Sequence, residues 1–323
     1  MIDFETALHQ VVRSKYCSIN QETNLASTAD YATKQSIYYT KRLEDNLYQD
    51  MDLSHFAEFS RGQGGELRET DTYGSRPMKM KSVRSSSALA FNTFGNCQVK
   101  IKSNSFGLPS KVYKITYEKP HRLIKSDNRD VSAWVDVVLL SSDEEDCIIV
   151  ESKMFEWLLN KPKPISEKYL SEELYISQQV GHLIIPTIKQ LLSGEEIIKE
   201  GRKSYIPIND QYDGIQILLH TIGFLTERQL GNYKNVKRVH IVNMIWTLHD
   251  KDLLGMYSNK YNEFLEKEQS QSHLFKEYFD KYISTIFNKL YGVEATFNAV
   301  EHYQIVNSLD INKNHKDYLL SRY

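Results

Sequence analysis

The feature that most constrains this sequence is a pair of apolar runs joined by a short polar stretch, with charged residues at fixed places in both runs. The first run covers residues 131–140 and contains Asp136, and the second covers residues 147–153 and ends in Glu151-Ser152-Lys153. Residues 141–146, Ser-Ser-Asp-Glu-Glu-Asp, separate them. Runs rich in β-branched residues on either side of a polar turn predict a β-hairpin.

The register of this hairpin follows from the position of its turn. If the turn centres between Asp143 and Glu144, Asp136 faces Glu151 across the ladder, and Lys153 lies on the same face because side chains alternate along a strand. No other Asp or Glu in the chain stands two residues ahead of a Lys. Two carboxylates about 5 Å apart repel by roughly 3 kcal/mol at an effective dielectric constant near 20, and like charges directly opposite each other destabilise a sheet.

A divalent cation would remove this repulsion. Mg²⁺ prefers one or two carboxylates and keeps several waters, which leaves room for phosphate oxygens. A Lys beside such an ion can orient or deprotonate a water and stabilise the negative charge of a phosphoryl transition state. The alternative is a hairpin whose charged side chains face water, and the spacing alone does not decide between the two.

Composition fits a folded protein and excludes several classes. The chain has 323 residues, of which 41% are hydrophobic and 25% charged, as in folded globular proteins. Its net charge of −2 excludes a uniformly basic nucleic-acid binder but not a local basic groove. The three cysteines are too few and too scattered for a disulfide framework or a zinc site. Neither a signal pattern nor a long apolar run is present, so we expect a soluble, cytoplasmic protein without a membrane partner.

The hydrophobic pattern divides the chain into three parts. Residues 1–60 and 251–323 have helical, charged patterns, and residues 61–250 form the part that contains the hairpin. The pattern of residues 154–210 predicts a helical insertion directly after Lys153. We expect this insertion to supply substrate contacts.

The middle part has its own order of elements. We expect a helix capped by Ser85–Ser87, a strand over residues 111–117, the hairpin, a helix over 210–224 and a strand over 236–248. This α-β-β-β-α-β order predicts an α/β (α+β) fold, with a mixed four-stranded sheet and helices packed against it.

This order, with Asp136, Glu151 and Lys153 on its second and third strands, resembles the PD-(D/E)XK nuclease superfamily, the restriction-endonuclease-like fold. The resemblance covers roughly residues 60–250. Three further segments look like a bacterial branch of restriction-endonuclease-like proteins: Gly64-Gly65-Glu66-Leu67, residues 85–92 and residues 216–220. The proline of the family motif is absent, because Trp134-Val135 stands before Asp136.

The resemblance implies an enzyme that hydrolyses DNA phosphodiesters with Mg²⁺, for which Mn²⁺ can substitute, in restriction or phage defence. It implies that Asp136 and Glu151 bind the metal and that Lys153 activates the attacking water. Many members add an acidic ligand from the first core helix or just before it. Here Glu66 is the first candidate for this ligand, and Glu58 is the second. The implied partners are double-stranded DNA and a cognate methyltransferase or another defence protein, and a homodimer is left open.

Two further groups of residues are candidates for this site. Gln216 and His220 lie four apart on one helix face. Gln216 is expected either beside the metal-bound water or phosphate, or as a satisfied polar residue at the helix edge, whereas His220 is interpreted as structural. Four basic residues precede the first core helix: Arg76, Lys79, Lys81 and Arg84. We expect them either to contact DNA phosphates or to form a solvated surface.

A second class of function stays open, namely a nucleic-acid-binding or assembly protein that keeps the fold without cleaving. The intact Asp136, Glu151 and Lys153 argue against it, since facing carboxylates cost stability that a non-catalytic sheet has no need to lose.

Overall fold

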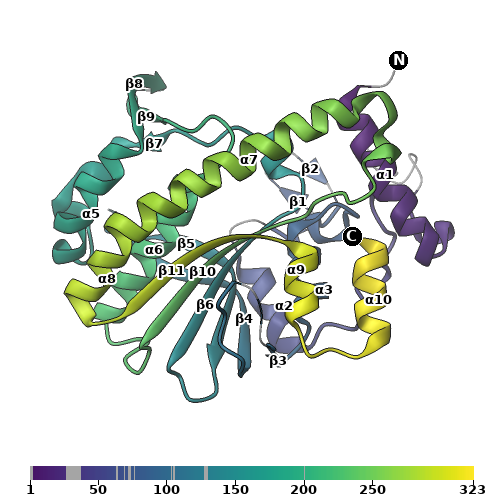
Figure 1. The fold of residues 1–323 in the computed structure, drawn as a ribbon, viewed down its shortest axis with the longest axis horizontal. Coiled ribbons are helices and arrows are strands. Elements are labelled where there is room, and N and C mark those ends of the chain that lie inside the picture. The colour runs from purple at the N-terminus through teal and green to yellow at the C-terminus, as the bar shows by residue number, and fades with distance from the viewer. Residues whose placement is uncertain are drawn as a thin grey trace.

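A six-stranded mixed sheet forms the centre of the molecule (Figure 1). The structure, a computed structural model, describes residues 3–26, 38–62, 65–68, 70–71, 74–75, 77–102, 104, 106–126, 130–199 and 201–323. In the order β11-β10-β6-β5-β4-β3, its strands are β3 (Gln98–Lys100), β4 (Val112–Ile124), β5 (Val131–Ser141), β6 (Asp146–Lys153), β10 (Arg238–Ile245) and β11 (Glu294–Glu301). The strands from β3 to β6 pair antiparallel, and β6, β10 and β11 pair parallel.

The sheet has two strands more than the four that the sequence predicted. β3 is three residues long, too short to show a period. β11 lies in the part that was expected to be wholly helical, and it pairs with β10 along its full length. Its buried residues are Ala295, Phe297 and Val300. Because this spacing breaks the alternation of a half-buried strand, β11 could not be recognised from the pattern.

Helices cover both faces of the sheet and enclose two hydrophobic cores. One core includes residues of α1 (Phe4–Ile19), α2 (Leu53–Arg61), α3 (Ser86–Phe94), α9 (His302–Ser308) and α10 (Lys313–Arg322). The other includes residues of α5 (Gln178–Gln190), α6 (Gly214–Gln229) and α8 (Ser284–Tyr291). The long helix α7 (Ser258–Tyr278) reaches both, with Tyr261 in the first core and Phe275 in the second. Among the described helices, none is both long and apolar enough to cross a membrane.

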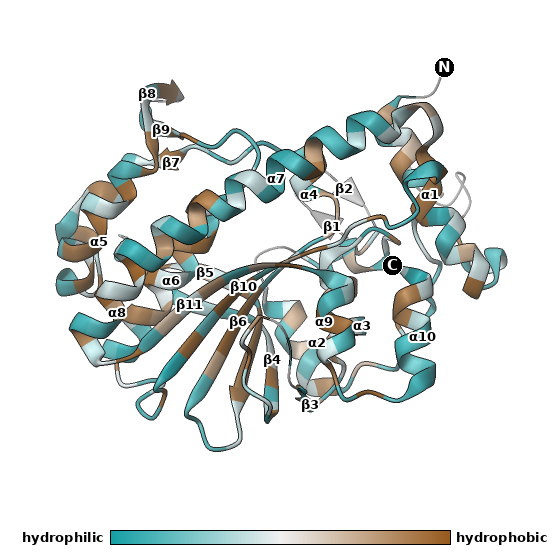
Figure 2. Cartoon of the chain, viewed as in Figure 1, coloured by the Kyte–Doolittle hydropathy of each residue, from teal (hydrophilic) through white to brown (hydrophobic). Residues whose placement is uncertain are grey.

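Strand β6 is buried on both faces. Ile148 and Val150 pack in the first core, and Cys147 and Ile149 in the second. A strand covered on both sides reads as a continuous apolar run rather than an alternating one, which explains the run that ends in the Glu-Ser-Lys motif. Figure 2 shows the hydrophobic stretches of the central strands between the two helical layers.

Residues 154–210 are not purely helical, which corrects the expected helical insertion. They contain α4 (Glu156–Leu159), α5 and a small three-stranded sheet of β7 (Ile165–Ser166), β9 (Arg202–Pro207) and β8 (Leu192–Lys199). Residues 193–198 of β8 are exposed, so no buried face imposes an alternating pattern on them. A two-stranded ribbon, β1 (Thr70–Asp71) and β2 (Gly74–Ser75), precedes α3.

The helices that flank the predicted motif begin at capping residues. Ser85 caps α3 by accepting a hydrogen bond from the Ala88 N–H at 3.1 Å, as the sequence predicted. Asp213 caps α6 by accepting from the Gln216 N–H at 3.0 Å, three residues beyond the predicted start. Gly223 lets α6 lie close to β4, because a Cβ at this position would come within 2.6 Å of the His121 side chain.

Candidate active site

Asp136 and Glu151 lie where β5 and β6 part. The ladder joins residues 137–140 to residues 147–150, so Asp136 and Glu151 are the next opposed positions. This confirms the predicted register of the hairpin. At that point Oδ2 of Asp136 accepts a hydrogen bond of 2.7 Å from the backbone N–H of Ser152. The Asp136 side chain therefore fixes the separation of the two strands.

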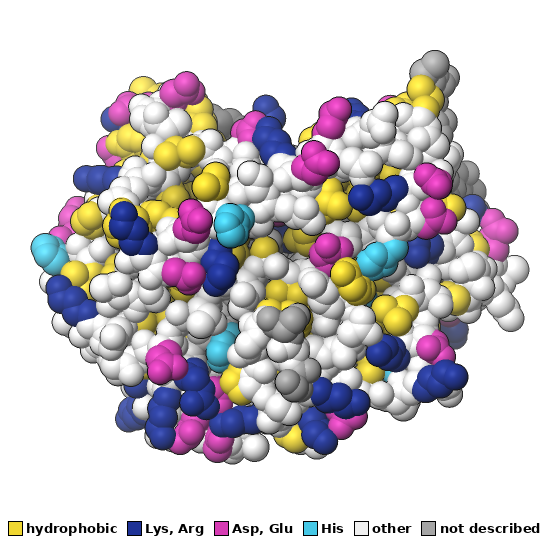
Figure 3. Space-filling view, in the orientation of Figure 1, with side chains coloured by type: hydrophobic (Ala, Val, Ile, Leu, Met, Phe, Trp, Pro, Cys, Tyr) yellow, Lys and Arg dark blue, Asp and Glu magenta, His cyan; other side chains and the backbone are white. Residues whose placement is uncertain are grey.

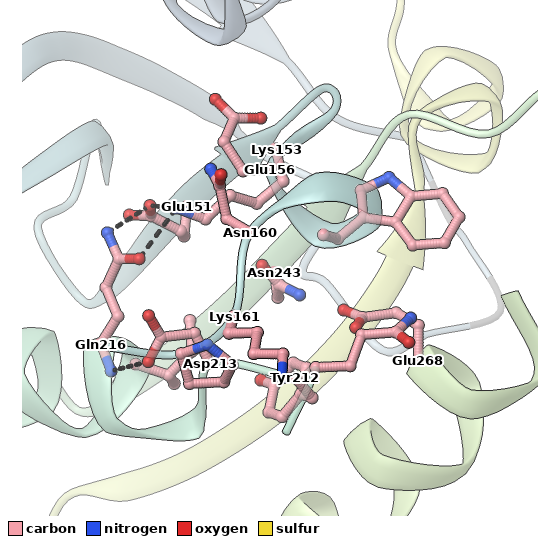
Figure 4. Close-up of a pocket in the computed structure, with 14 residues that line it drawn as sticks. Glu151, Lys153, Glu156, Asn160, Lys161, Tyr212, Asp213, Gln216, Asn243 and Glu268 are labelled. Atoms are coloured by element: carbon pink, nitrogen blue, oxygen red, sulfur yellow. Dashed lines mark hydrogen bonds and ion pairs between the residues drawn. The ribbon is translucent and has the colours of Figure 1, made fainter. Parts of the chain in front are cut away.

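Three side chains hold the carboxylate of Glu151, and Figure 4 shows Lys153 and Gln216 among them. Its Oε1 atom lies 2.6 Å from Nζ of Lys153 and accepts a hydrogen bond of 2.6 Å from Nε2 of Gln216. Its Oε2 atom lies 2.8 Å from Nε2 of His220. Lys153 also donates to Oε1 of Gln216 at 2.8 Å, so these three residues form a closed triangle. The sequence predicts a structural role for His220: its spacing of four puts it on the helix face of Gln216, but does not reveal the contact with Glu151.

The two carboxylates differ in their affinity for protons. Burial raises the pKa of Asp136 well above its ordinary value, and the charge of Glu151 raises it further. Burial also acts to raise the pKa of Glu151, but the charges of Lys153 and His220 outweigh it and lower that pKa to about 2. Burial acts to lower the pKa of Lys153, and the carboxylate of Glu151 more than reverses it. Glu151 and Lys153 are therefore an ion pair, whereas Asp136 forms no ion pair with a basic side chain among the residues that the structure describes.

A further buried carboxylate, Glu118 of β4, belongs to this site and was not predicted. Its neighbours in β4 pair with Val137 and Val135, which places Glu118 opposite Asp136. It is 8% exposed, and its φ of +45° lies in the left-handed region, which residues other than glycine rarely adopt. The predicted strand ended at Tyr117, one residue short of it. Glu118 was missed because no pattern in the sequence showed that the strand continues past this irregular backbone position.

The charge of Glu66 acts on Glu118. Burial, followed by the charges of Glu66 and Glu151, raises the pKa of Glu118 to about 8. The Oε1 atom of Glu66 is 3.9 Å from Nζ of Lys79. The structure therefore brings the expected acidic residue to the same group of carboxylates.

Glu58, the second candidate for the acidic ligand, contacts the backbone of β4 and a histidine. Its Oε2 atom accepts a hydrogen bond of 2.9 Å from the backbone N–H of Tyr117 and lies 2.7 Å from Nδ1 of His55. These contacts support the irregular part of β4 just before Glu118. The structure thus favours Glu66 over Glu58 as a cation ligand.

A cavity of about 50 Å³ lies beside Lys153 (Figure 4). Its walls come from the end of β6, residues 156–162, the start of α6, and α7. Besides Glu151, its lining includes the acidic residues Glu156, Asp213 and Glu268. Burial raises the pKa of Asp213 and that of Glu268, the latter to about 8. The first residues of the insertion therefore adjoin the candidate site.

The fold separates the four basic residues ahead of α3. Arg76 lies outside the described residues. Lys81 is only 7% exposed, which does not favour contact with DNA. Lys79 and Arg84 line a second cavity, of about 500 Å³, together with Ser85–Ser87 at the start of α3. Lys79 and Arg84 are thus the members of this set that border an open, polar cavity.

Two further basic residues, Lys111 just before β4 and Arg122 within it, form ion pairs. Lys111 lies 2.6 Å from the carboxylate of Asp146, and Arg122 lies 2.7 Å from Glu227. On the face seen in Figure 3, acidic and basic side chains are interspersed. Lys111 and Arg122 therefore have partners within the fold.

No ready-made metal group exists in the described part of the chain: no three His, Cys, Asp or Glu side chains are gathered in a way that could hold an ion. Comparisons with known proteins add no relative. No protein-family model, no curated protein and no solved structure matches this chain. The geometry of the site itself is therefore the basis for a functional proposal.

Proposed function

We propose that this protein is a Mg²⁺-dependent endonuclease of the PD-(D/E)XK type, which hydrolyses phosphodiesters of double-stranded DNA in restriction or phage defence. One observation carries the proposal: Asp136 stands opposite Glu151 where two strands part, and Lys153 is bonded to Glu151. Buried carboxylates of this kind, beside a lysine, suit a cation and a phosphate.

The order of the core elements supports the same assignment. Helix α3 is followed by β4, β5 and β6, and then by α6 and β10. Strands β4, β5 and β6 are antiparallel, and β10 is parallel to β6. This order agrees with the α-β-β-β-α-β order expected from the sequence and supports the proposal, within a six-stranded sheet that has β3 and β11 at its edges.

Asp136, Glu151 and Glu66 are the residues that would hold the ion. The donor set fits, because Mg²⁺ and Mn²⁺ favour carboxylate oxygens and because, within the described ranges, buried Asp136 is in no ion pair with a basic side chain. When bound, the ion supplies Lewis-acid polarisation of a phosphate oxygen and lowers the pKa of a bound water.

Lys153 and Gln216 would act on the attacking water. Because Glu151 raises its pKa, Lys153 is a cation before substrate binds. Its first role is therefore to orient the water and to stabilise negative charge on the phosphate, and it can take up a proton only after losing its own. Gln216 bonds both Lys153 and Glu151 and holds the two in place.

DNA would lie across the cavity that Lys79 and Arg84 line. Contacts from these residues to phosphates position the duplex and carry no sequence information. Lys81 could join them only after its side chain leaves its buried position. Such an enzyme would act in the cytoplasm, and a cognate methyltransferase would protect the DNA of its own cell.

The alternative remains a protein that binds nucleic acid, or assembles with others, on the same fold without cleaving. One observation favours it: Glu151 already has three partners and is neutralised without a cation. Asp136 and Glu118 argue the other way, because burial and neighbouring carboxylates raise the pKa of both, and in the described part of the chain neither forms an ion pair.

Cleavage assays on purified protein test the proposal. The protein is incubated with unmodified and methylated phage and plasmid DNA, with and without Mg²⁺. Cleavage is expected only with the ion and only from protein with an intact Asp136. Glu294→Gln, at the far end of the same sheet, serves as the matched control. Equal cleavage by the parent and the Asp136→Asn protein would end the assignment.

A further inference from the structure

The capacity of each carboxylate to accept further bonds differs sharply across the site. A carboxylate has about four lone-pair positions, two on each oxygen. In Glu151, Oε1 already receives Lys153 and Gln216, and Oε2 receives His220. One position is left for a ligand. In Asp136, the N–H of Ser152 occupies one lone-pair position of Oδ2.

The lone-pair positions of the Glu118 carboxylate differ from those of Glu151 and Asp136. Among the described residues, its carboxylate has no hydrogen-bond or ion-pair partner, although the side chain is more than nine-tenths buried. A buried polar group without a partner is costly. Its neighbours Tyr117 and Lys119 pair with Val137 and Val135 in the β4–β5 ladder, so Glu118 stands at the position opposite Asp136.

We propose that Glu118 is a further ligand of the divalent cation, which it binds together with Asp136 across β4 and β5, while Glu151 stays paired with Lys153. The inference rests on the proposed function for the identity of the ion, Mg²⁺ or Mn²⁺. In the described part of the chain no three such side chains are gathered closely enough to hold an ion, so ion binding would draw the carboxylates together. Ligands on two neighbouring strands need only small side-chain movements to do so.

Gly62 keeps the position of Glu118 open. A Cβ at residue 62 would lie 2.6 Å from Oε2 of Glu118, a distance that real contacts do not show. Gly62 follows α2, whose Glu58 bonds the N–H of Tyr117 just before Glu118. The end of α2 therefore leaves room for this carboxylate while it fixes the adjoining backbone.

Binding of Mn²⁺ to the full-length protein tests the proposal, measured by calorimetry and by electron paramagnetic resonance. Glu118→Gln keeps the shape of the side chain and is expected to weaken Mn²⁺ binding at least tenfold. Gly62→Ala, which displaces the carboxylate, should weaken it in the same direction. Glu294→Gln is the control, since it removes the same charge at the start of β11, on the edge strand of the sheet and away from the site. It should bind Mn²⁺ within twofold of the parent.

The outcomes separate this inference from the proposed function. Unchanged Mn²⁺ affinity in Glu118→Gln, from a parent that binds and cleaves, overturns the role of Glu118 and leaves the nuclease in place. A parent that binds Mn²⁺ through Glu118 but cleaves no DNA keeps the ligand and removes the nuclease. No Mn²⁺ binding by the parent at millimolar concentration overturns both. Melting curves of each variant confirm that the protein tested is folded.

Discussion

The backbone N–H of Ser152 donates a 2.7 Å hydrogen bond to the carboxylate of Asp136, one position beyond the last pair of the β5–β6 ladder. This bond replaces the backbone contact that a continuing ladder would make. It satisfies the amide where the strands separate, and a buried N–H needs such a partner. It also fixes the side chain, so that Oδ1 stays available for a ligand.

Asp136→Asn should abolish cleavage and leave the fold intact. The amide oxygen can still accept from Ser152, but the negative charge that a cation needs is gone. Because the variant also removes the repulsion with Glu151 and Glu118, its melting temperature without metal should equal or exceed that of the parent. Calorimetric melting with and without Mg²⁺ checks this, and a large loss of stability would contradict the account of the repulsion.

Lys79→Ala should weaken DNA binding without changing the chemical step. Loss of one phosphate contact lowers the slope of log K against log salt concentration by about 1. Binding titrations at several salt concentrations measure this slope, and single-turnover cleavage at saturating protein measures the chemical step. Lys237→Ala is the control, because Lys237 pairs with Glu145 at the turn end of the hairpin, away from the site. Equal slopes for the parent and Lys79→Ala would remove Lys79 from the DNA contact.

The hairpin could be predicted from sequence because two independent constraints agree there. The polar turn fixes which residues face each other, and the period of two fixes which side chains share a face. Observed strands end at Ser141 and resume at Asp146, one residue inside the predicted loop at each side. Within this element, the register of the strands follows from local chemistry alone.

Other parts of the site depend on contacts that no local pattern encodes. Glu118 lies in β4, two residues before Pro120, and its φ is left-handed. The predicted strand stops just before Glu118, whereas β4 continues to Ile124. His220 reaches Glu151 only because α6 packs closely on the sheet at Gly223. Glu268 comes from α7, more than a hundred residues beyond the motif in the chain. Long-range packing, and not propensity, places all three.

Glu268→Gln should stabilise the protein increasingly as the pH rises. Burial raises the folded-state pKa of Glu268 to about 8, above its ordinary value of 4.5. Between these two pH values the unfolded chain releases a proton that the folded protein still holds, so the stability of the parent falls as the pH rises. The melting temperatures of the two proteins should agree near pH 4.5 and differ by several degrees at pH 8. A constant difference over this range would contradict the shift.

Lys153→Ala should reduce both activity and stability. The variant leaves Glu151, 2% exposed, with only Gln216 and His220 as partners. Breaking a buried ion pair by removal of one partner costs about 3–5 kcal/mol. Cleavage should fall by several orders of magnitude, since the water and the phosphate lose their cation. Mn²⁺ binding should remain measurable, because the carboxylates are intact.

A double-mutant cycle separates the two effects of Lys153. Adding Glu151→Gln to Lys153→Ala removes the unpaired buried charge and should recover much of the lost stability, but none of the activity. Lys153→Arg should keep stability better than Lys153→Ala and still not restore the full rate, because a guanidinium cannot give up a proton near neutral pH. Denaturant unfolding gives the stabilities, and single-turnover cleavage gives the rates. If Lys153→Ala retained full activity, the nuclease assignment at these residues would be wrong, whatever its stability.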